Sequence, residues 1–188
     1  MSQYFIEQSS ISHFFFSSAR SSLLWLLVRI YLGYEWFMAG WEKIHSPAWV
    51  GDSSGTALTG FLNGALHKTA EYCQPAPAAC HPDVQDWYAA FLQNVVLPNA
   101  AVWSQMVAWG EVFIGVALII GFFVGVTAFV SVFTSYNFLL AGTVSVNPIL
   151  CALGIGLILA WRVAGHWGAD RYVLPMIRTD VRPEVFRK

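Results

Sequence analysis

Long apolar runs alternate with polar segments along the chain of 188 residues. Four runs are long enough to consider as membrane-spanning helices, at about residues 22–42, 104–124, 127–142 and 148–165. A helix needs roughly 20 apolar residues to cross about 30 Å of hydrocarbon, so the third and fourth runs should recruit flanking residues or pack inside the bundle. The pattern predicts an all-α membrane protein, a bundle of four transmembrane helices in a single domain covering residues 1–188.

The segment between the first two runs, about residues 43–103, is longer than an ordinary connection and should have structure of its own. Within it, apolar residues recur twice at helical spacing, first at Leu58, Phe61, Leu62 and Leu66 and then at Trp87, Phe91, Leu92 and Val95. This spacing predicts two short amphipathic helices lying over one mouth of the bundle.

Composition and charge support lipid as the solvent. The chain is 56% hydrophobic and 11% charged, whereas a soluble domain carries about 25% charged residues. Arg20 precedes the first run and six Lys or Arg residues lie at or after the end of the fourth, whereas only Lys43 and Lys68 lie in the long loop. The positive-inside rule then predicts a multi-pass protein of the cytoplasmic membrane with both termini cytoplasmic, an outer loop at 43–103 and a cytoplasmic tail at 166–188. The net charge of -1 offers no basic surface for nucleic acid.

Two cysteines in the outer loop, Cys73 and Cys80, are separated by six residues. On the oxidising side of a membrane they could form a disulfide that staples the loop or a redox-active pair, and the absence of a C-x-x-C spacing favours the staple. Cys151, in the fourth run, is most simply a buried apolar residue. No motif for a metal, haem or flavin is visible, so electron transfer would need a diffusible cofactor or a partner.

Charged and small residues form a stripe in the first run, where Arg29, Gly33, Trp36, Gly40 and Lys43 follow at intervals of 4, 3, 4 and 3. The glycines allow a neighbouring helix or a ligand to approach closely, which plain helix packing also explains. Two cations are not needed for packing, however, and ionisable residues inside a membrane mark functional sites by default.

Further polar residues are expected at the outer side of the bundle. Glu35 lies on another face of the first helix, Glu111 lies within the second run, and Asn137 and Asn147 lie near the ends of the third and fourth. We expect these groups to converge on a polar pocket beneath the outer loop. The structural alternative is a single buried ion pair between Arg29 and Glu111.

The order and spacing of several motifs resemble those of the DoxX/DoxD family. They are R-x3-G-x2-W-x3-G-x2-K, then PAW, GTALTGFL, WYAAFL, VAWGE, NFLLAGT, NP and GADR, and together they run from about Arg29 to Pro175. The resemblance implies a four-helix membrane bundle. DoxD members are the small, quinone-linked subunit of thiosulfate:quinone oxidoreductase and act beside a second subunit, DoxA, so a DoxA-like partner would be required.

The reaction that the resemblance implies would oxidise thiosulfate to tetrathionate and reduce membrane quinone, the electron acceptor. Because quinone reduction consumes two protons, the buried carboxylates of Glu35 and Glu111 suit proton delivery. Arg29 could hold Glu111 or donate a hydrogen bond to a quinone carbonyl.

Substrate contacts are expected around the same pocket. Lys43 and His45 could attract the thiosulfate dianion at the outer mouth, and Trp36 and Trp109 could form walls for a quinone ring. Together with Asn137 and Asn147, these residues complete the expected binding site.

Two other function classes remain open at this stage. The chain could be a membrane scaffold for a redox or thiol-stress complex, with its basic tail as the docking surface, or a transporter of a small solute, assembled as a homo-oligomer. No inverted repeat or pair of broken helices supports the transporter.

Overall fold

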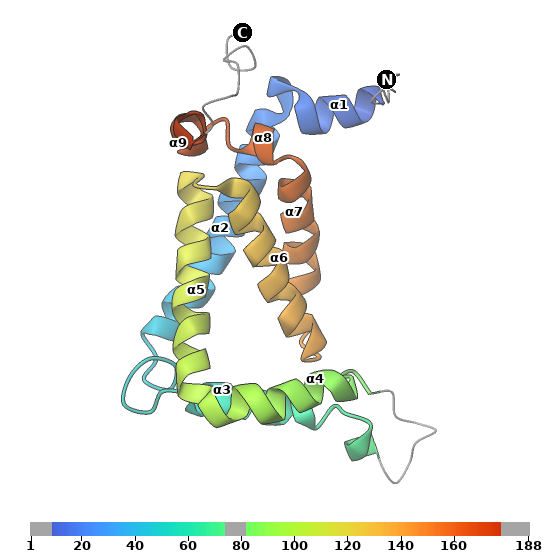
Figure 1. Cartoon of the computed structure of the whole chain (residues 1–188), viewed down its shortest axis with the longest axis vertical. Helices are drawn as coiled ribbons and strands as arrows, with labels where there is room; N and C mark the ends of the chain where they lie inside the picture. The colour runs from blue at the N-terminus through green and yellow to red at the C-terminus, as the bar shows by residue number, and fades with distance from the viewer. Residues whose placement is uncertain (1–8, 74–81, 178–188) are drawn as a thin grey trace.

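The computed structural model describes residues 9–73 and 82–177, and the regular structure within these ranges is entirely helical. Four long helices lie side by side and form an elongated bundle (Figure 1). They are α2 (Ser22–Ile44), α5 (Ala100–Ile120), α6 (Val124–Leu140) and α7 (Asn147–Leu159). They correspond in order to the four predicted apolar runs.

Shorter helices close the two ends of the bundle (Figure 1). One end, which we call the terminal end, carries α1 (Ser10–Ser17), α8 (Trp161–Ala164) and α9 (Asp170–Ile177). The other, the cap end, carries α3 (Thr56–Leu66) and α4 (Asp86–Phe91), which lie across the ends of the long helices. The predicted loop with two short amphipathic helices therefore has its counterpart in the cap.

Helix ends differ from the predicted spans where the backbone turns. The second predicted span runs to residue 124, but α5 ends at Ile120 because Gly121 and Phe123 adopt left-handed conformations with φ of 72° and 46°. The fourth predicted span runs to residue 165, but α7 ends at Leu159 and α8 follows after a break at Ala160. Neither turn has a proline that would have marked it in the sequence.

By length and composition, one continuous helical stretch in the described ranges, Asp86–Ile120, could cross a membrane. This stretch includes α4, a π-helical turn at Leu92–Val96, a 3-10 turn at Leu97–Asn99 and then α5. Such irregular turns bend a helix, and Figure 1 shows the chain turning here from the cap into the bundle. The helices α6 and α7 are apolar but shorter.

The long helices form two pairs, α2 with α5 and α6 with α7. Small residues bring α2 and α5 into backbone contact: a Cβ added to Gly40 would lie 2.5 Å from the backbone nitrogen of Val112. Gly33 and Gly115 lie in the same contact, against Ile119 and Phe37 respectively. Small residues at such positions are how helices pack closely in membranes.

Two apolar cores hold the molecule together. The bundle core includes Leu32, Leu118 and Leu157, each with no exposed surface, and the cap core includes Leu62 and Val84. The predicted face of α3 is correct, because Leu58, Leu62 and Leu66 are buried.

The predicted buried face of α4 is displaced by one residue. Tyr88, Leu92 and Val96 are buried, whereas Trp87 and Val95 are 63% and 43% exposed. The Tyr88 hydroxyl donates a hydrogen bond to the backbone oxygen of Asn137 at 3.0 Å, which turns this face towards α6. The periodicity of the sequence could not show which face of this segment is buried, since apolar residues occupy both faces.

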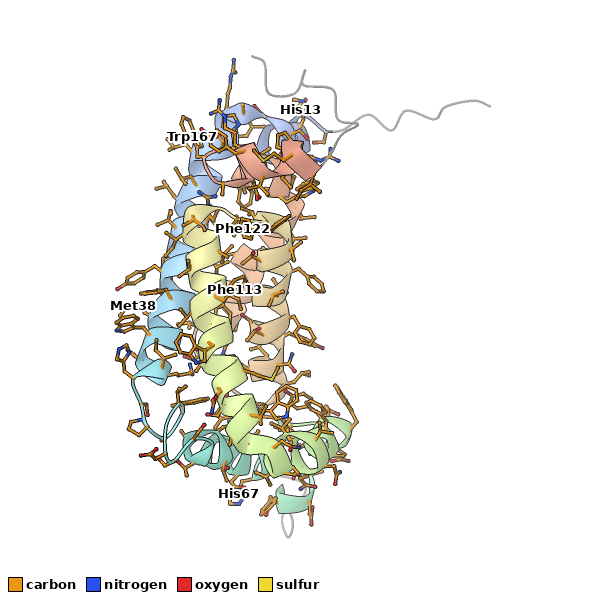
Figure 2. All side chains as sticks on the ribbon, turned by 60° about the vertical axis from the view of Figure 1, so that its left-hand side comes forward. His13, Met38, His67, Phe113, Phe122 and Trp167 are labelled. Atoms are coloured by element: carbon orange, nitrogen blue, oxygen red, sulfur yellow. The ribbon has the colours of Figure 1, made fainter. Side chains whose placement is uncertain are left out.

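Large apolar side chains cover the outside of the bundle and point away from it (Figure 2). They include Leu27 on α2, Phe113 on α5, and Phe129 and Phe133 on α6, each more than 60% exposed. Soluble proteins rarely expose apolar surface on this scale. This surface fits contact with lipid.

Candidate functional site

The predicted stripe on α2 forms one face of the helix, directed into the bundle. Arg29, Gly33, Trp36 and Gly40 are buried, and Lys43 is half-buried. The stripe does not lead to a single pocket, however. Its members contact different partners along the length of the molecule.

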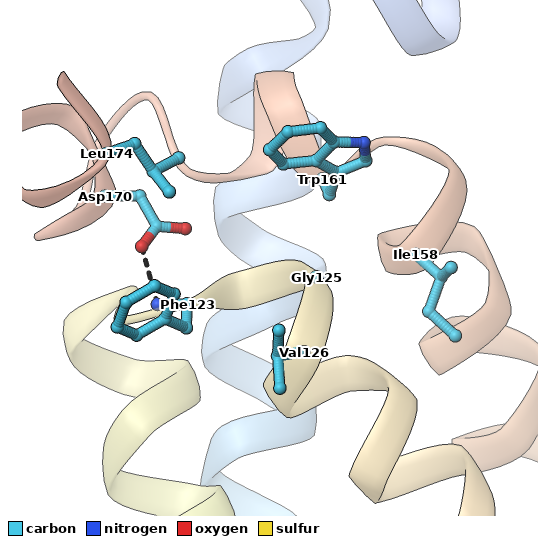
Figure 3. Close-up of a pocket in the computed structure, with 7 residues that line it drawn as sticks. All are labelled: Phe123, Gly125, Val126, Ile158, Trp161, Asp170 and Leu174. Atoms are coloured by element: carbon cyan, nitrogen blue, oxygen red, sulfur yellow. Dashed lines mark hydrogen bonds between the residues drawn. The ribbon is translucent and has the colours of Figure 1, made fainter. Parts of the chain in front are cut away.

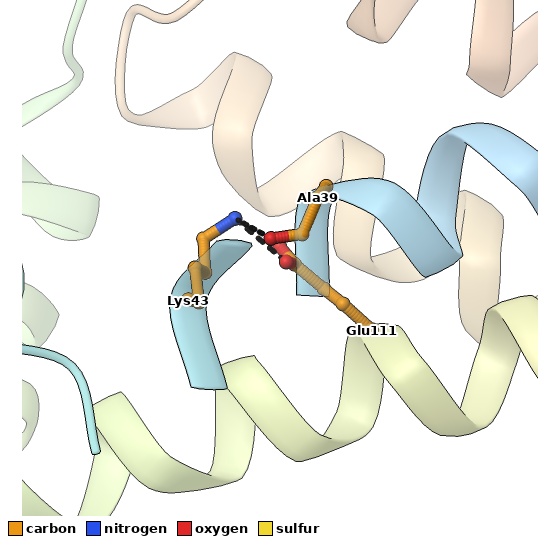
Figure 4. A network of polar contacts seen from close by, with 3 residues as sticks. All are labelled: Ala39, Lys43 and Glu111. Atoms are coloured by element: carbon orange, nitrogen blue, oxygen red, sulfur yellow. Dashed lines mark hydrogen bonds and ion pairs between the residues drawn. The ribbon is translucent and has the colours of Figure 1, made fainter. Parts of the chain in front are cut away.

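An ion pair between Lys43 and Glu111 is the main buried charge contact near the cap. The Lys43 Nζ donates to the Glu111 Oε2 at 2.6 Å and to the Ala39 carbonyl oxygen at 3.3 Å (Figure 4). Glu111 is only 2% exposed, whereas the Lys43 side chain is 20% exposed. The ring of Trp49 lies against the ammonium group, with its centroid 5.3 Å away. Glu111 is therefore neutralised by a lysine that itself retains access to solvent.

Hydroxyl groups of α6 face the same interior. The Trp36 Nε1 donates to the Ser131 Oγ at 2.7 Å. One turn later, Ser135 is fully buried, and its hydroxyl has no hydrogen-bond partner among the described residues. Glu111 lies nine residues before the end of α5 and Ser135 eleven residues after the start of α6, so the two lie at similar depth. Buried hydroxyls are normally paired, which makes Ser135 a candidate ligand contact.

Arg29 does not pair with Glu111, contrary to the structural alternative from the sequence. It precedes Lys43 by 14 residues, which is about 21 Å along a helix, and it lies near the terminal end. Its Nη2 donates to the Trp167 carbonyl oxygen at 3.0 Å. Gly121 and Gly168 pack against the guanidinium group. Its Nε and Nη1 have no hydrogen-bond partner in the described ranges.

Asp170 is a buried site residue that the sequence reasoning did not single out, although it belongs to the GADR motif. Its carboxylate accepts hydrogen bonds from the backbone N–H groups of Phe123 at 2.6 Å and Val124 at 2.8 Å. It thus caps the start of α6. Burial raises the pKa of the Asp170 carboxyl above its ordinary value, while these two N–H groups and the charge of Arg29 oppose the rise.

The two asparagines make local contacts. The Asn137 side-chain amide donates to the Phe133 carbonyl oxygen at 2.8 Å, and its Oδ1 accepts from the Tyr88 hydroxyl at 3.2 Å. The Asn147 amide donates to the Thr143 carbonyl oxygen at 3.0 Å. These bonds tie the cap and a connecting turn to the bundle, and they do not bring either asparagine to Glu111.

Three further predicted residues lie away from the Lys43–Glu111 pair. Glu35 is half-buried and has no ion-pair or hydrogen-bond partner among the described residues. Trp109 is 54% exposed on the outside of α5. His45 is exposed, and its Nδ1 lies 2.8 Å from the Trp41 carbonyl oxygen.

The predicted pair of cysteines cannot be placed, because Cys80 and the side chain of Cys73 lie outside the described residues. Cys151 is a half-buried free thiol. Within the described ranges, no three His, Cys, Asp or Glu residues come together as a group that could hold a metal ion.

Two cavities lie elsewhere in the molecule. The larger, of about 380 Å³, lies at the terminal end between α6, α7, α8 and α9. The smaller, of about 300 Å³, lies beside α4 and is lined in part by Thr69, Glu71 and Asp86. Neither is lined by Arg29, Lys43 or Glu111.

Exposed charges are segregated between the two ends. At the cap end, five carboxylates and one lysine are exposed among the described residues: Glu42, Asp52, Glu71, Asp83, Asp86 and Lys68. At the terminal end, the exposed charged residues of the described chain are Arg20, Arg162 and Arg171. The cap end is therefore electronegative and the terminal end electropositive.

Comparison with known proteins identifies the family. The sequence model of the DoxX family matches residues 24–144, more than half of the chain. No curated protein and no solved structure gives a significant match. The matched region begins in α2 and ends beyond α6, so it includes the α2 stripe, the Lys43–Glu111 pair and the cap. The chain belongs to the DoxX family of membrane proteins.

Proposed function

We propose that this chain is the membrane subunit of a quinone-linked oxidoreductase of the DoxD type, which reduces membrane quinone with electrons from thiosulfate. The observation that carries the proposal is the Glu111 carboxylate, buried within the bundle and held at 2.6 Å by a partly exposed lysine. An apolar contact would join α2 to α5 without the cost of burying charge. Proton transfer would explain why the chain buries this ion pair, because the reduction of a quinone to a quinol consumes two protons.

Lys43 and Glu111 are arranged as a proton entry. The lysine is the exposed member and lies towards the cap, and the carboxylate is the buried member. In the proposal, Lys43 exchanges protons with solvent, and Glu111 carries them one at a time within the bundle. The ring of Trp49, with its centroid 5.3 Å from the Lys43 Nζ, lies against the exposed member of the pair.

The position of the quinone follows from packing. α2 and α5 are in backbone contact at Gly33, Gly40 and Gly115, so a ring cannot lie between them. We therefore place the quinone-binding site on the side of Glu111 that faces α6. There the Ser135 hydroxyl, which has no hydrogen-bond partner among the described residues, can donate a hydrogen bond to a quinone carbonyl, and the Trp36 indole donates to Ser131, one turn before Ser135.

Thiosulfate is assigned to a partner chain. A dianion approaching the cap end would meet five exposed carboxylates and one exposed lysine, and the Lys43 charge is already balanced by Glu111. Such a field repels anions. Our proposal therefore gives the thiosulfate site to a DoxA-like subunit and not to Lys43 and His45.

The proposal includes four membrane crossings, by α2, α5, α6 and α7, with both termini in the cytoplasm. Segregation of exposed charge supports it, since exposed arginines gather at the terminal end and positive residues favour the cytoplasmic side. α7, with 13 residues, is about 20 Å long and needs α8 or local thinning of the bilayer to complete a crossing.

Thiosulfate-dependent reduction of a short-chain quinone tests the function. The assay uses the purified chain alone and together with any chain that co-purifies with it. We expect reduction with the partner present and quinone binding by this chain alone. Absence of both would reject the oxidoreductase assignment and favour a scaffold or a transporter.

A further inference from the structure

The larger cavity, at the terminal end, has the shape of a site for hydrocarbon. Its volume of about 380 Å³ falls within the range of about 300–1,000 Å³ that small-molecule sites occupy. Phe123, Val126, Ile158, Trp161 and Leu174 surround the same space (Figure 3). Val126 is 62% exposed on the outside of α6, so the cavity borders the lipid-facing surface.

The walls of the cavity offer little to a polar ligand. Among the described residues, Asp170 is the one charged side chain that lines it, and both of its carboxylate oxygens already accept backbone hydrogen bonds at the start of α6. Gly125 lets α6 approach Trp161 closely at the edge of this space, since a Cβ there would lie 3.0 Å from the Cβ of Trp161. An alkyl chain could fill such a space without leaving polar groups unpaired.

Two arginines directly follow residues that line the cavity. Arg162 lies over the ring of Trp161, with its Cζ 5.2 Å from the ring centroid, and Arg171 follows Asp170. Both are exposed, and neither has an ion-pair partner in the described ranges. A guanidinium group recognises a phosphate well because it presents several donors in a fixed plane.

We propose that this cavity binds one acyl chain of an anionic phospholipid, whose phosphate group contacts Arg162 and Arg171. An apolar cavity whose lining residues Trp161 and Asp170 are each followed by an exposed arginine, without an ion-pair partner among the described residues, matches an amphiphile with a negative head. A quinone has no anionic head and would make no use of the arginines. Inorganic phosphate has no chain to fill the cavity.

Two short helices at the terminal end expose the apolar surface expected of helices that lie in a headgroup region. α1 and α9 lie across the end of the bundle (Figure 1), and both expose large apolar side chains, among them Ile11, Phe14, Tyr172 and Met176. Short amphipathic helices of this kind lie in the headgroup region of a bilayer. The arginines on α8 and α9 are then level with the phosphates of that leaflet.

The proposal is tested with the full-length chain, delipidated in neutral detergent and titrated with phosphatidylglycerol or with phosphatidylcholine of the same acyl chains. Lipid retention is measured by native mass spectrometry and stability by thermal unfolding. We expect one phosphatidylglycerol to be retained and to raise the unfolding temperature more than phosphatidylcholine does. Inorganic phosphate should leave the temperature unchanged.

Three variants separate the two parts of the site. In the double variant R162Q/R171Q, the preference for phosphatidylglycerol over phosphatidylcholine should fall at least tenfold. Val126→Trp places a large ring at the exposed edge of the cavity and should abolish retention of both lipids. Arg20→Gln removes another exposed cation of the same end, one that is not adjacent in the sequence to a residue lining the cavity, and should leave the preference unchanged.

Several outcomes would overturn the proposal. The first is equal retention of phosphatidylglycerol and phosphatidylcholine by the wild-type chain. The second is a preference for phosphatidylglycerol that survives in R162Q/R171Q. The third is a loss of this preference in Arg20→Gln as large as in R162Q/R171Q, which would indicate a general surface potential. Displacement of the lipid by quinone with unchanged affinity in R162Q/R171Q would assign the cavity to the quinone tail.

Discussion

Residues of one stripe on α2 have separate roles at the two ends of the molecule. Lys43 neutralises Glu111 near the cap, and Arg29 bonds the Trp167 carbonyl oxygen at the terminal end. The spacing of charged and small residues correctly predicted that they share a buried face. It could not predict their partners, because these come from helices distant in sequence.

Removing the lysine should destabilise the chain by stranding a buried charge. We expect Lys43→Met to lower the free energy of unfolding by about 3 kcal/mol, the lower end of the range for a broken buried pair, since Lys43 is partly exposed. Denaturant unfolding in detergent measures this. The double variant K43M/E111L should regain most of the loss, and a double variant as unstable as the single one would contradict the pairing.

Asp170 should contribute to stability through the start of α6. In Asp170→Asn the side chain keeps one acceptor oxygen, so one of the N–H groups of Phe123 and Val124 loses its partner. We expect the free energy of unfolding to fall by about 1–3 kcal/mol, which is measured as a lower midpoint of denaturation. Asp83→Asn, which changes an exposed carboxylate of the cap, is the matched control and should have little effect. Equal midpoints for the two variants would remove Asp170 from this role.

At the scale of helices, composition and periodicity predicted all four long helices, the two cap helices and the buried face of α3. The ends of α5 and α7 and the face of α4 were not predictable in this way. These depend on left-handed residues at Gly121 and Phe123 and on the Tyr88–Asn137 hydrogen bond. The glycine at 121 is a local stop signal that the apolar pattern overrode, whereas the Tyr88–Asn137 hydrogen bond is a tertiary contact that a single sequence does not reveal.

Close packing of α2 on α5 should tolerate no side chain at Gly40. We expect Gly40→Leu to lower the free energy of unfolding by about 1–3 kcal/mol, the usual range for overpacking, because the new Cβ would meet the backbone of Val112. Gly60→Ala is the control, since a Cβ there has open space around it, and it should be neutral or slightly stabilising. The prediction fails if both variants unfold at the same temperature.

The whole molecule combines an apolar exterior, an electronegative cap end and an electropositive terminal end. This arrangement predicts that the cap faces outward and the termini face the cytoplasm. A cysteine introduced at Asp52 in the cap should react with a membrane-impermeant thiol reagent in intact cells, and one introduced at Arg171 should react only after permeabilisation. The Cys73→Ser, Cys80→Ser, Cys151→Ser background is needed for both. If only the cysteine at position 171 reacts in intact cells, the topology is the reverse of the predicted one. If both cysteines react, the predicted topology is rejected.

The assignment of the whole molecule to quinone chemistry depends on Glu111. The most direct test compares thiosulfate-dependent quinone reduction, with the proposed DoxA-like subunit present, in wild-type protein, Glu111→Gln and Glu42→Gln. The last variant removes an exposed carboxylate adjacent to Lys43 in the chain. We predict that Glu111→Gln keeps its fold and its quinone binding but loses at least tenfold of the turnover, whereas Glu42→Gln retains it. Unchanged turnover in a folded Glu111→Gln variant would contradict the account.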